Sequence, residues 1–112
     1  MDGADRNKPS QFTEVKRLLP ETPLLLVIFP YEYQLRANSF ETLGPQHSIK
    51  EAGRIAGIAM YDLYDDLVEH LKHNFLSSKS IYLFDDPMHF NSVGHRVIAE
   101  LVYRHIEKET IN

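Results

Sequence analysis

The chain has 112 residues, which is the size of a single domain, and its formal net charge at pH 7 is −4. A net negative charge does not suit a surface that binds nucleic acid, because such a surface must neutralise phosphates with lysine and arginine. The absence of cysteine excludes a disulfide framework, a thiolate metal site and a cysteine nucleophile. We therefore expect at most one domain, held together by packing alone, with no nucleic acid partner.

No apolar run in the sequence is long enough to cross a bilayer, because the longest one covers only residues 24–29. The first eleven residues, MDGADRNKPSQ, are polar and have no signal-peptide core. As written, the sequence predicts a cytoplasmic chain without a membrane segment, although a longer parent could be exported. We divide it into a polar N-terminal segment, residues 1–11, and part of one domain, residues 12–112.

The first part of the chain predicts a helix followed by a strand. Apolar residues recur at helical spacing between residues 12 and 19, and Pro20 stops this helix. Residues 22–30, TPLLLVIFP, are too few for a helix and too uniformly apolar for a strand with one wet face. They predict a strand buried on both faces, as in a parallel sheet covered by helices. Residues 31–46 are predicted as a long connection leaving the carboxyl end of that strand, where open α/β sheets form a ligand crevice.

The middle of the chain predicts a helix, a second strand and another helix. Apolar positions over residues 47–56 have helical spacing, and Gly57 is a natural C-cap for such a helix. Residues 58–61 then supply a second inner strand, and apolar side chains at four-residue steps indicate a helix over residues 63–75. The alternative, a single helix that continues through residues 58–76, stays open at this boundary.

The end of the chain predicts a polar loop at residues 77–80, a short apolar run and a long amphipathic helix. Apolar side chains between residues 93 and 106 share one face of this helix, which we expect to pack on the sheet. Asn91 or Ser92 is expected to cap its first turn. Helices and strands alternate along the chain, which predicts a layered α/β domain.

The segment FDDPMHFN places acids, a proline and a histidine directly before the final helix. Pro87 disfavours helical geometry at Asp86 and suits the first central position of a turn, so Asp86 and His89 are expected on the same side of a tight loop. A carboxylate bonded to one imidazole nitrogen fixes the tautomer and leaves the other nitrogen free as a base. This is the chemistry of the orienting acid and the general base of a serine hydrolase.

These residues resemble the last conserved block of the SGNH (GDSL-type) hydrolases, a superfamily of esterases and lipases. The resemblance rests on Asp86-x-x-His89, on the following Phe90-Asn91-x-x-Gly94-His95 and on a helix containing Ile98-Ala99-Glu100. It extends backward to a buried strand ending in Pro30, a Gly57-Ile58 step and a YDL segment. The resemblance implies a three-layer α/β/α flavodoxin-like fold, of which this chain supplies the later parallel strands and helices.

The resemblance also implies that His89 is the general base and Asp86 its orienting acid in ester hydrolysis through an acyl-serine intermediate. The substrate would be a small ester or an acylated carbohydrate, for example an acetylated one, and no cofactor is required. The family's Gly-Asp-Ser nucleophile block and its oxyanion-hole blocks do not occur in this sequence. The chain therefore resembles the carboxyl-terminal half of such a hydrolase, and we expect it to lack robust esterase activity in isolation.

Two expectations concern what the chain contacts. Tyr31, Glu32 and Gln34 follow the first strand at the rim of the predicted crevice, so they are candidates for substrate contact, with a polar loop and aromatic packing as the equal alternative. A sheet without its early strands exposes an apolar edge, which is a template for pairing with another chain. We therefore expect self-association, strand swapping or a complementing N-terminal fragment.

Three alternatives accompany this interpretation. The chain could be a non-catalytic interaction or remnant module of the same fold. Asp85 competes with Asp86 as the acid, but its place before the turn indicates a solvated side chain, and His95 is interpreted as a packing or capping residue. Asp85, Asp86, His89 and His95 together have the ligand types of a zinc or iron site, although such a short loop would have to make all four converge. We expect no metal.

Overall fold

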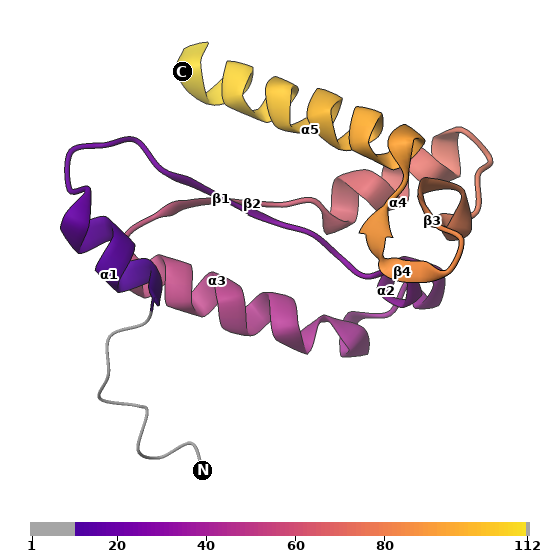
Figure 1. The fold of residues 1–112 in the computed structure, drawn as a ribbon, viewed down its shortest axis with the longest axis horizontal. Helices are drawn as coiled ribbons and strands as arrows, with labels where there is room; N and C mark the ends of the chain where they lie inside the picture. Colours follow the sequence, from indigo (N-terminus) through magenta and orange to yellow (C-terminus); the bar gives the residue numbers. More distant parts are fainter. Residues whose placement is uncertain (1–10, 112) are drawn as a thin grey trace.

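The computed structural model describes residues 11–111, which form a mixed α/β arrangement (Figure 1). In chain order the elements are α1 (Gln11–Leu18), β1 (Leu25–Ile28), α2 (Glu32–Ala37), the 3₁₀ helix η2 (Phe40–Leu43), α3 (Gly44–Ala56), β2 (Ala59–Asp62), α4 (Tyr64–His73), the 3₁₀ helix η3 (Ser78–Ile81), β3 (Tyr82–Leu83), β4 (Asp86–Phe90) and α5 (Ser92–Ile111). Strands β1 and β2 form a parallel pair, and β3 and β4 form a separate antiparallel hairpin. The predicted N-terminal segment, residues 1–11, lies outside the described residues except for Gln11.

The parallel pair is built as a strand, a crossover and a strand. Leu25 lies opposite Ala59, and Ile28 lies opposite Asp62. Helix α3 makes the crossover and runs along one side of the pair, while α5 runs along the other side (Figure 1). Gly57 ends α3 at φ 74°, a left-handed backbone conformation that favours glycine, so the prediction of a C-cap there is confirmed. The alternative of one continuous helix is wrong, because β2 follows directly.

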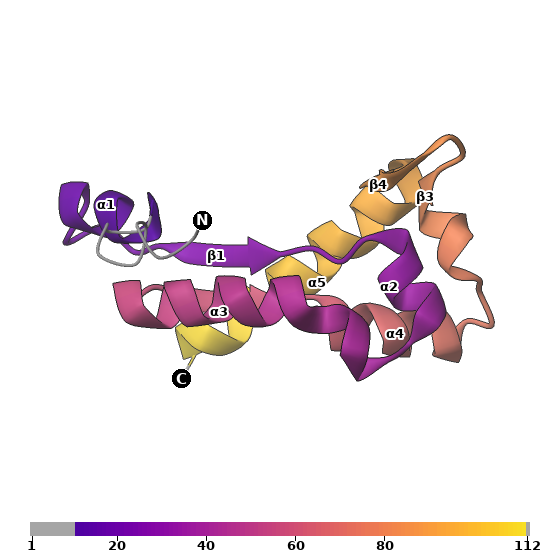
Figure 2. The same cartoon turned by 90° about the horizontal axis from the view of Figure 1, so that it is seen from below.

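The prediction that the first strand is buried on both faces is wrong. Ile28 is 4% exposed, whereas Leu25, Leu26 and Val27 are only half-buried. The reason is that the sheet has two strands over residues 11–111, so neither of its faces is fully covered (Figure 2). The structure is accordingly a mixed α/β arrangement with a small parallel sheet, which is coarser than the three-layer flavodoxin-like fold that the resemblance implies.

The long connection predicted over residues 31–46 follows β1 and is helical, because it contains α2, η2 and the start of α3. The side-chain carbonyl of Gln34 accepts a hydrogen bond from the Tyr31 backbone N–H at 2.8 Å, which satisfies a free donor at the start of α2. Asn38 ends α2 in the left-handed region at φ 48°. Pro45 occupies the first turn of α3, where its fixed φ fits a helix.

The hairpin contradicts the predicted role of Pro87. Phe84 and Asp85 form the turn between β3 and β4, and Pro87 lies inside β4 instead of at the first central position of a turn. A two-stranded hairpin leaves an outer edge on each strand, where a missing N–H costs no ladder hydrogen bond. The restricted backbone that Pro87 imposes on Asp86 is therefore extended and belongs to a strand.

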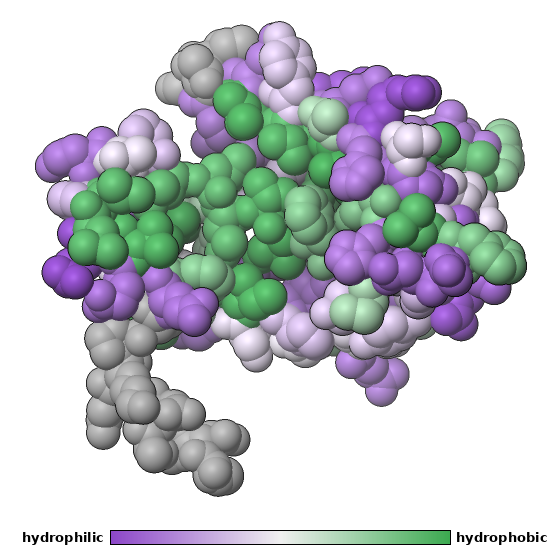
Figure 3. All heavy atoms as spheres, in the orientation of Figure 1, coloured by the Kyte–Doolittle hydropathy of each residue, from purple (hydrophilic) through white to green (hydrophobic). Residues whose placement is uncertain are grey.

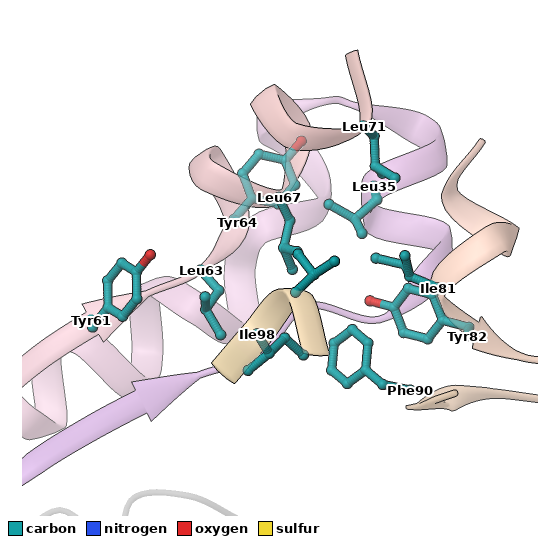
Figure 4. Packing of buried hydrophobic residues seen from close by; sticks show 11 residues of the cluster. Leu35, Tyr61, Leu63, Tyr64, Leu67, Leu71, Ile81, Tyr82, Phe90 and Ile98 are labelled. Carbon is teal, nitrogen blue, oxygen red and sulfur yellow. The ribbon is translucent and has the colours of Figure 1, made fainter. Parts of the chain in front are cut away.

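The main hydrophobic core gathers in the elements that follow the carboxyl ends of β1 and β2 (Figure 4). Its buried members come from α2, β2, α4, the hairpin region and the first part of α5: Leu35, Tyr61, Leu63, Tyr64, Leu67, Leu71, Ile81, Tyr82, Phe90, Val97 and Ile98. Full burial of each large apolar side chain contributes about 1.5–3 kcal/mol. This core fixes the hairpin and the start of α5 against α2 and α4.

Helix α5 reaches the sheet only in its later part. Its first turns pack against η3 and β4, and farther along the His105 ring stacks on Tyr61 of β2 with centroids 4.2 Å apart. The expectation that this helix packs on the sheet is met at the stack of His105 on Tyr61, and its buried residues Val97 and Ile98 share the main core with Tyr61. Within residues 11–111, no helix has the length and apolar character needed to span a membrane.

Candidate functional site

Asn91 joins the hairpin to the last helix. Its backbone N–H donates to the Ile81 carbonyl at 3.0 Å, and its side-chain amide donates to the carbonyls of Ser80 at 2.9 Å and Tyr82 at 3.1 Å. Its side-chain oxygen accepts from the Gly94 N–H at 2.8 Å. The prediction of an N-cap is confirmed at Asn91. The same side chain also ties η3 and β3 to α5, which the sequence did not indicate.

Gly94 permits the close approach of α5 to this junction. A Cβ atom built at Gly94 would lie 2.2 Å from the Ile81 carbonyl oxygen and 3.0 Å from the Cβ of Phe90. Only a residue without a side chain fits there unless the backbone moves. Phe90 itself is buried in the core and contacts the Phe29 ring edge-on, with centroids 5.7 Å apart. The strand that carries His89 is therefore held by packed residues at its Phe90 end.

Asp86 and His89 are brought together as the sequence predicts. His89 Nδ1 lies 2.7 Å from Asp86 Oδ2, and the Met88 backbone N–H donates to Asp86 Oδ1 at 3.1 Å. The hydrogen bond with His89, followed by the one from Met88, holds the pKa of the Asp86 carboxyl below its ordinary value. Both oxygens of the carboxylate thus have partners that favour its ionised form.

The second nitrogen of His89 is available to a ligand. The His89 side chain is 72% exposed and that of Asp86 is 39% exposed. Among residues 11–111, the hydrogen-bond partner of the His89 ring is Asp86, at Nδ1. Because a carboxylate accepts from Nδ1–H, the neutral ring carries its lone pair on Nε2. That nitrogen can take a proton from a hydroxyl group placed beside it.

The competing residues at the junction take other places. Asp85 is exposed in the hairpin turn, and His95 is exposed in the first turn of α5, where its backbone N–H donates to the Asn91 carbonyl at 2.9 Å. Across residues 11–111, no three histidine, aspartate or glutamate side chains come together in an arrangement that could hold a metal ion. The four residues considered as metal ligands therefore do not converge.

A cavity of about 690 Å³ borders the strand that carries the pair. Pro87 and Asn91, two residues before and two residues after His89, line it together with Glu32, Arg36 and Lys79. The aromatic and aliphatic side chains of the hairpin complete its wall. A volume of this size is within the range of small-molecule sites. The charged groups of this wall are the cations Arg36 and Lys79 and the carboxylate Glu32, which is paired with Arg36.

Glu32 is a buried carboxylate in the wall of this cavity. Its side chain is 5% exposed and accepts hydrogen bonds from Ser78 Oγ at 2.5 Å and from Arg36 Nε at 3.2 Å. Burial is the largest single effect and would raise the pKa of Glu32, but the hydrogen bonds from Ser78 and Arg36 and the charges of Arg36 and Lys79 together lower it below its ordinary value. Glu32 is therefore a satisfied carboxylate that anchors α2 to η3.

The other two residues predicted to contact substrate have different surroundings. Gln34 is 1% exposed, and its side-chain amide donates to the Thr42 carbonyl at 2.8 Å and bonds with the side chain of Gln46 at 2.9 Å. Tyr31 is exposed, with its ring 6.3 Å from that of Tyr33. Of the three predicted residues, Glu32 alone is among those that line the cavity.

Some residues of the site had no role in the sequence prediction. Arg36 could have been found from its i,i+4 spacing to Glu32, which places both side chains on one face of a helix. Ser78 lies 46 residues from Glu32 in the sequence, and neither it nor Lys79 belongs to a recognisable motif. No serine among residues 11–111 is hydrogen-bonded to His89, since Ser78 bonds to Glu32 and Ser80 donates to a backbone carbonyl.

In comparisons with known proteins, no family model, no curated protein and no solved structure matches this chain. The resemblance to the SGNH hydrolases therefore rests on the residues of the chain itself. Any functional assignment has to be carried by the geometry of the Asp86 and His89 pair and its surroundings.

Proposed function

We propose that this chain carries the acid and base half of an SGNH-type ester hydrolase. The observation that carries the proposal is the 2.7 Å contact between Asp86 Oδ2 and His89 Nδ1, which leaves Nε2 free at the surface. The substrate class, a small ester or an acylated carbohydrate, comes from the resemblance, because the cavity of about 690 Å³ beside the same strand is lined by neither Asp86 nor His89.

In the proposed reaction, His89 Nε2 takes the hydroxyl proton of a serine as the serine oxygen attacks the ester carbonyl carbon. Asp86 stabilises the imidazolium that forms, and its lowered pKa keeps it ionised throughout. The imidazolium then gives the proton to the leaving alcohol oxygen, and an acyl-serine remains. Water repeats the sequence, with His89 as base and then acid, and releases the carboxylic acid.

The nucleophile of this reaction would come from another segment or another chain. No serine of residues 11–111 bonds to His89, and the sequence has no Gly-Asp-Ser block. The three-layer fold and the supply of the missing strands belong to the same proposal. The two-stranded parallel sheet, which has room for further strands beside β1, is compatible with it.

A non-catalytic module is the second candidate, and a specific observation favours it. The pair is solvent-exposed, with His89 72% and Asp86 39% exposed, and exposed ion pairs are common on surfaces without any catalytic role. In this alternative, the Asp86 and His89 pair only stabilises strand β4 ahead of α5. The two candidates differ in whether His89 is required for chemistry.

The deciding experiment extends the chain with the coding sequence that lies upstream in frame, and measures hydrolysis of 4-nitrophenyl acetate. The hydrolase proposal predicts a Gly-Asp-Ser segment in the extension, and a loss of activity on the order of 10³-fold or more in His89→Ala. His95→Ala is the matched control, because it removes an exposed histidine from the same junction but leaves the pair intact. Equal activity in the two variants, or no Gly-Asp-Ser segment, supports the non-catalytic module.

A further inference from the structure

The outer edge of β1 is unpaired. Within residues 11–111, β1 hydrogen-bonds to β2 alone. Figure 2 shows β1 along the outside of the sheet, with no strand of the described chain beside its free edge. Such an edge offers backbone donors and acceptors to another strand.

The backbone groups that face outward can be assigned from one hydrogen bond. The Ile28 carbonyl accepts from the Leu63 N–H at 3.0 Å, so the backbone polar groups of Ile28 point toward β2. Successive residues of a strand direct these groups to opposite edges. Leu25 and Val27 therefore direct their N–H and C=O groups to the free edge. A second strand can meet both residues with a regular ladder.

The surface beside this edge is apolar. Leu18 is 65% exposed, Leu19 is 44% exposed and Phe29 is 50% exposed. In Figure 3, which has the orientation of Figure 1, apolar surface continues from the end of α1 across the middle of the molecule, where β1 runs. A contiguous apolar area that includes an unpaired strand marks an interaction surface.

The usual protection of an edge strand is missing. Natural edge strands carry lysine, inward-pointing charges or bulges that prevent pairing. Residues 22–31, TPLLLVIFPY, contain no charged side chain, and the prolines Pro23 and Pro30 lie outside β1 at either end. The central four residues are therefore free to pair, and pairing with a copy of the same strand brings no like charges together.

We propose that β1 pairs with β1 of a second copy of the chain, antiparallel and about a two-fold axis, to give a sheet of four strands. An isologous contact of this kind closes on itself and stops at a dimer. In the antiparallel arrangement, the outward backbone groups of Leu25 and Val27 in one copy meet the same groups of the other copy across the axis. The dimer and the strands that would complete the proposed hydrolase use the same free edge of β1, so one β1 cannot pair with both.

Sedimentation velocity over a range of concentrations tests the proposal with the 112-residue chain. We expect a concentration-dependent equilibrium of monomer and dimer. Val27→Pro removes an outward N–H but no bond to β2, so it should shift the chain to monomer while far-UV circular dichroism stays unchanged. Phe84→Ser is the control, because Phe84 is fully exposed at the hairpin tip, away from β1, and the control should dimerise as the wild type does.

Crosslinking keeps the proposal testable where Val27→Pro does not fold. The chain has no cysteine, so single cysteines at residues 25–28 and at Phe84 can each be oxidised with diamide. A two-fold contact predicts efficient disulfide dimers at one or two of the β1 positions and none from Phe84→Cys, since the Cβ atoms must come within about 4.5 Å. Three results would overturn the proposal: a monomer at all concentrations, open-ended aggregation, or a loss of dimers in Phe84→Ser alone. A monomer at all concentrations would leave the edge of β1 to a strand of another protein.

Discussion

Replacing Asn91 with alanine should unfold the junction that holds His89. The substitution removes three side-chain hydrogen bonds, namely the cap on the Gly94 N–H and the two bonds to the carbonyls of Ser80 and Tyr82. Loss of a helix cap costs about 1 kcal/mol, and each lost bond to a partly buried carbonyl costs about 1 kcal/mol more. The expected loss in the free energy of unfolding is therefore about 3 kcal/mol, a large share of the stability of a domain this small.

Urea unfolding followed by circular dichroism measures this loss, with a change in midpoint and little change in slope. Ser92→Ala is the matched control, because Ser92 is exposed and adjacent, and it should change the free energy of unfolding by less than about 0.5 kcal/mol. A loss below about 1 kcal/mol in Asn91→Ala would refute the idea that this side chain joins η3, β3 and α5.

Two further predictions concern the same region. Gly94→Ala should destabilise the fold by about 1–3 kcal/mol, because the new Cβ would overlap the Ile81 carbonyl, and an unchanged urea midpoint would contradict this close approach. The pKa of Glu32 is lower in the folded chain than in the unfolded chain. Ionised Glu32 therefore stabilises the fold fully at pH values above the unfolded pKa. This stabilisation is lost as the pH falls through the folded pKa. Thermal unfolding between about pH 3 and pH 7 should show this acid-side loss. Glu32→Gln should reduce the loss, and Glu51→Gln, on an exposed face of α3, should keep most of it.

The elements with regular apolar spacing could be predicted from the sequence. Apolar side chains at helical spacing predict helices α1, α3 and α4. An apolar run after a glycine cap predicts strand β2. The same reasoning failed for α2, which has six residues and is stabilised at its start by the Gln34 side chain. A helix so short has no periodic pattern that single-sequence reasoning can detect.

The pairing of Asp86 with His89 could also be predicted, although for a partly wrong reason. Proline restricts the residue before it to extended geometry, which is compatible with a turn and with an edge strand, and the local sequence does not choose between them. The strand arises because Tyr82 pairs with Phe90 and both rings enter the core, which is a tertiary contact. Although both residues lie in β4, the Asp86 carboxylate still reaches the His89 ring three residues later, at 2.7 Å.

The surroundings of the pair could not be predicted. Glu32 and Ser78 are 46 residues apart, and their contact depends on how α2 packs against η3. The burial of β1 was overestimated, because an apolar run indicates only that a strand prefers to be covered, and no strand of residues 11–111 pairs with its outer edge. That unmet preference of the β1 sequence is the physical reason for expecting a partner at its edge.

The central claim is that Asp86 orients His89 as a base, and the tautomer of the His89 ring tests it most directly. Long-range ¹H–¹⁵N correlation spectra of the 112-residue chain report this tautomer in alkaline buffer, where imidazole is neutral. The account predicts that His89 carries its proton on Nδ1, held by Asp86, and that Asp86→Ala abolishes this preference while the exposed His95 is unaffected. A His89 ring protonated on Nε2 in the wild type, or a tautomer unchanged by Asp86→Ala, would contradict the assignment of His89 as an oriented base.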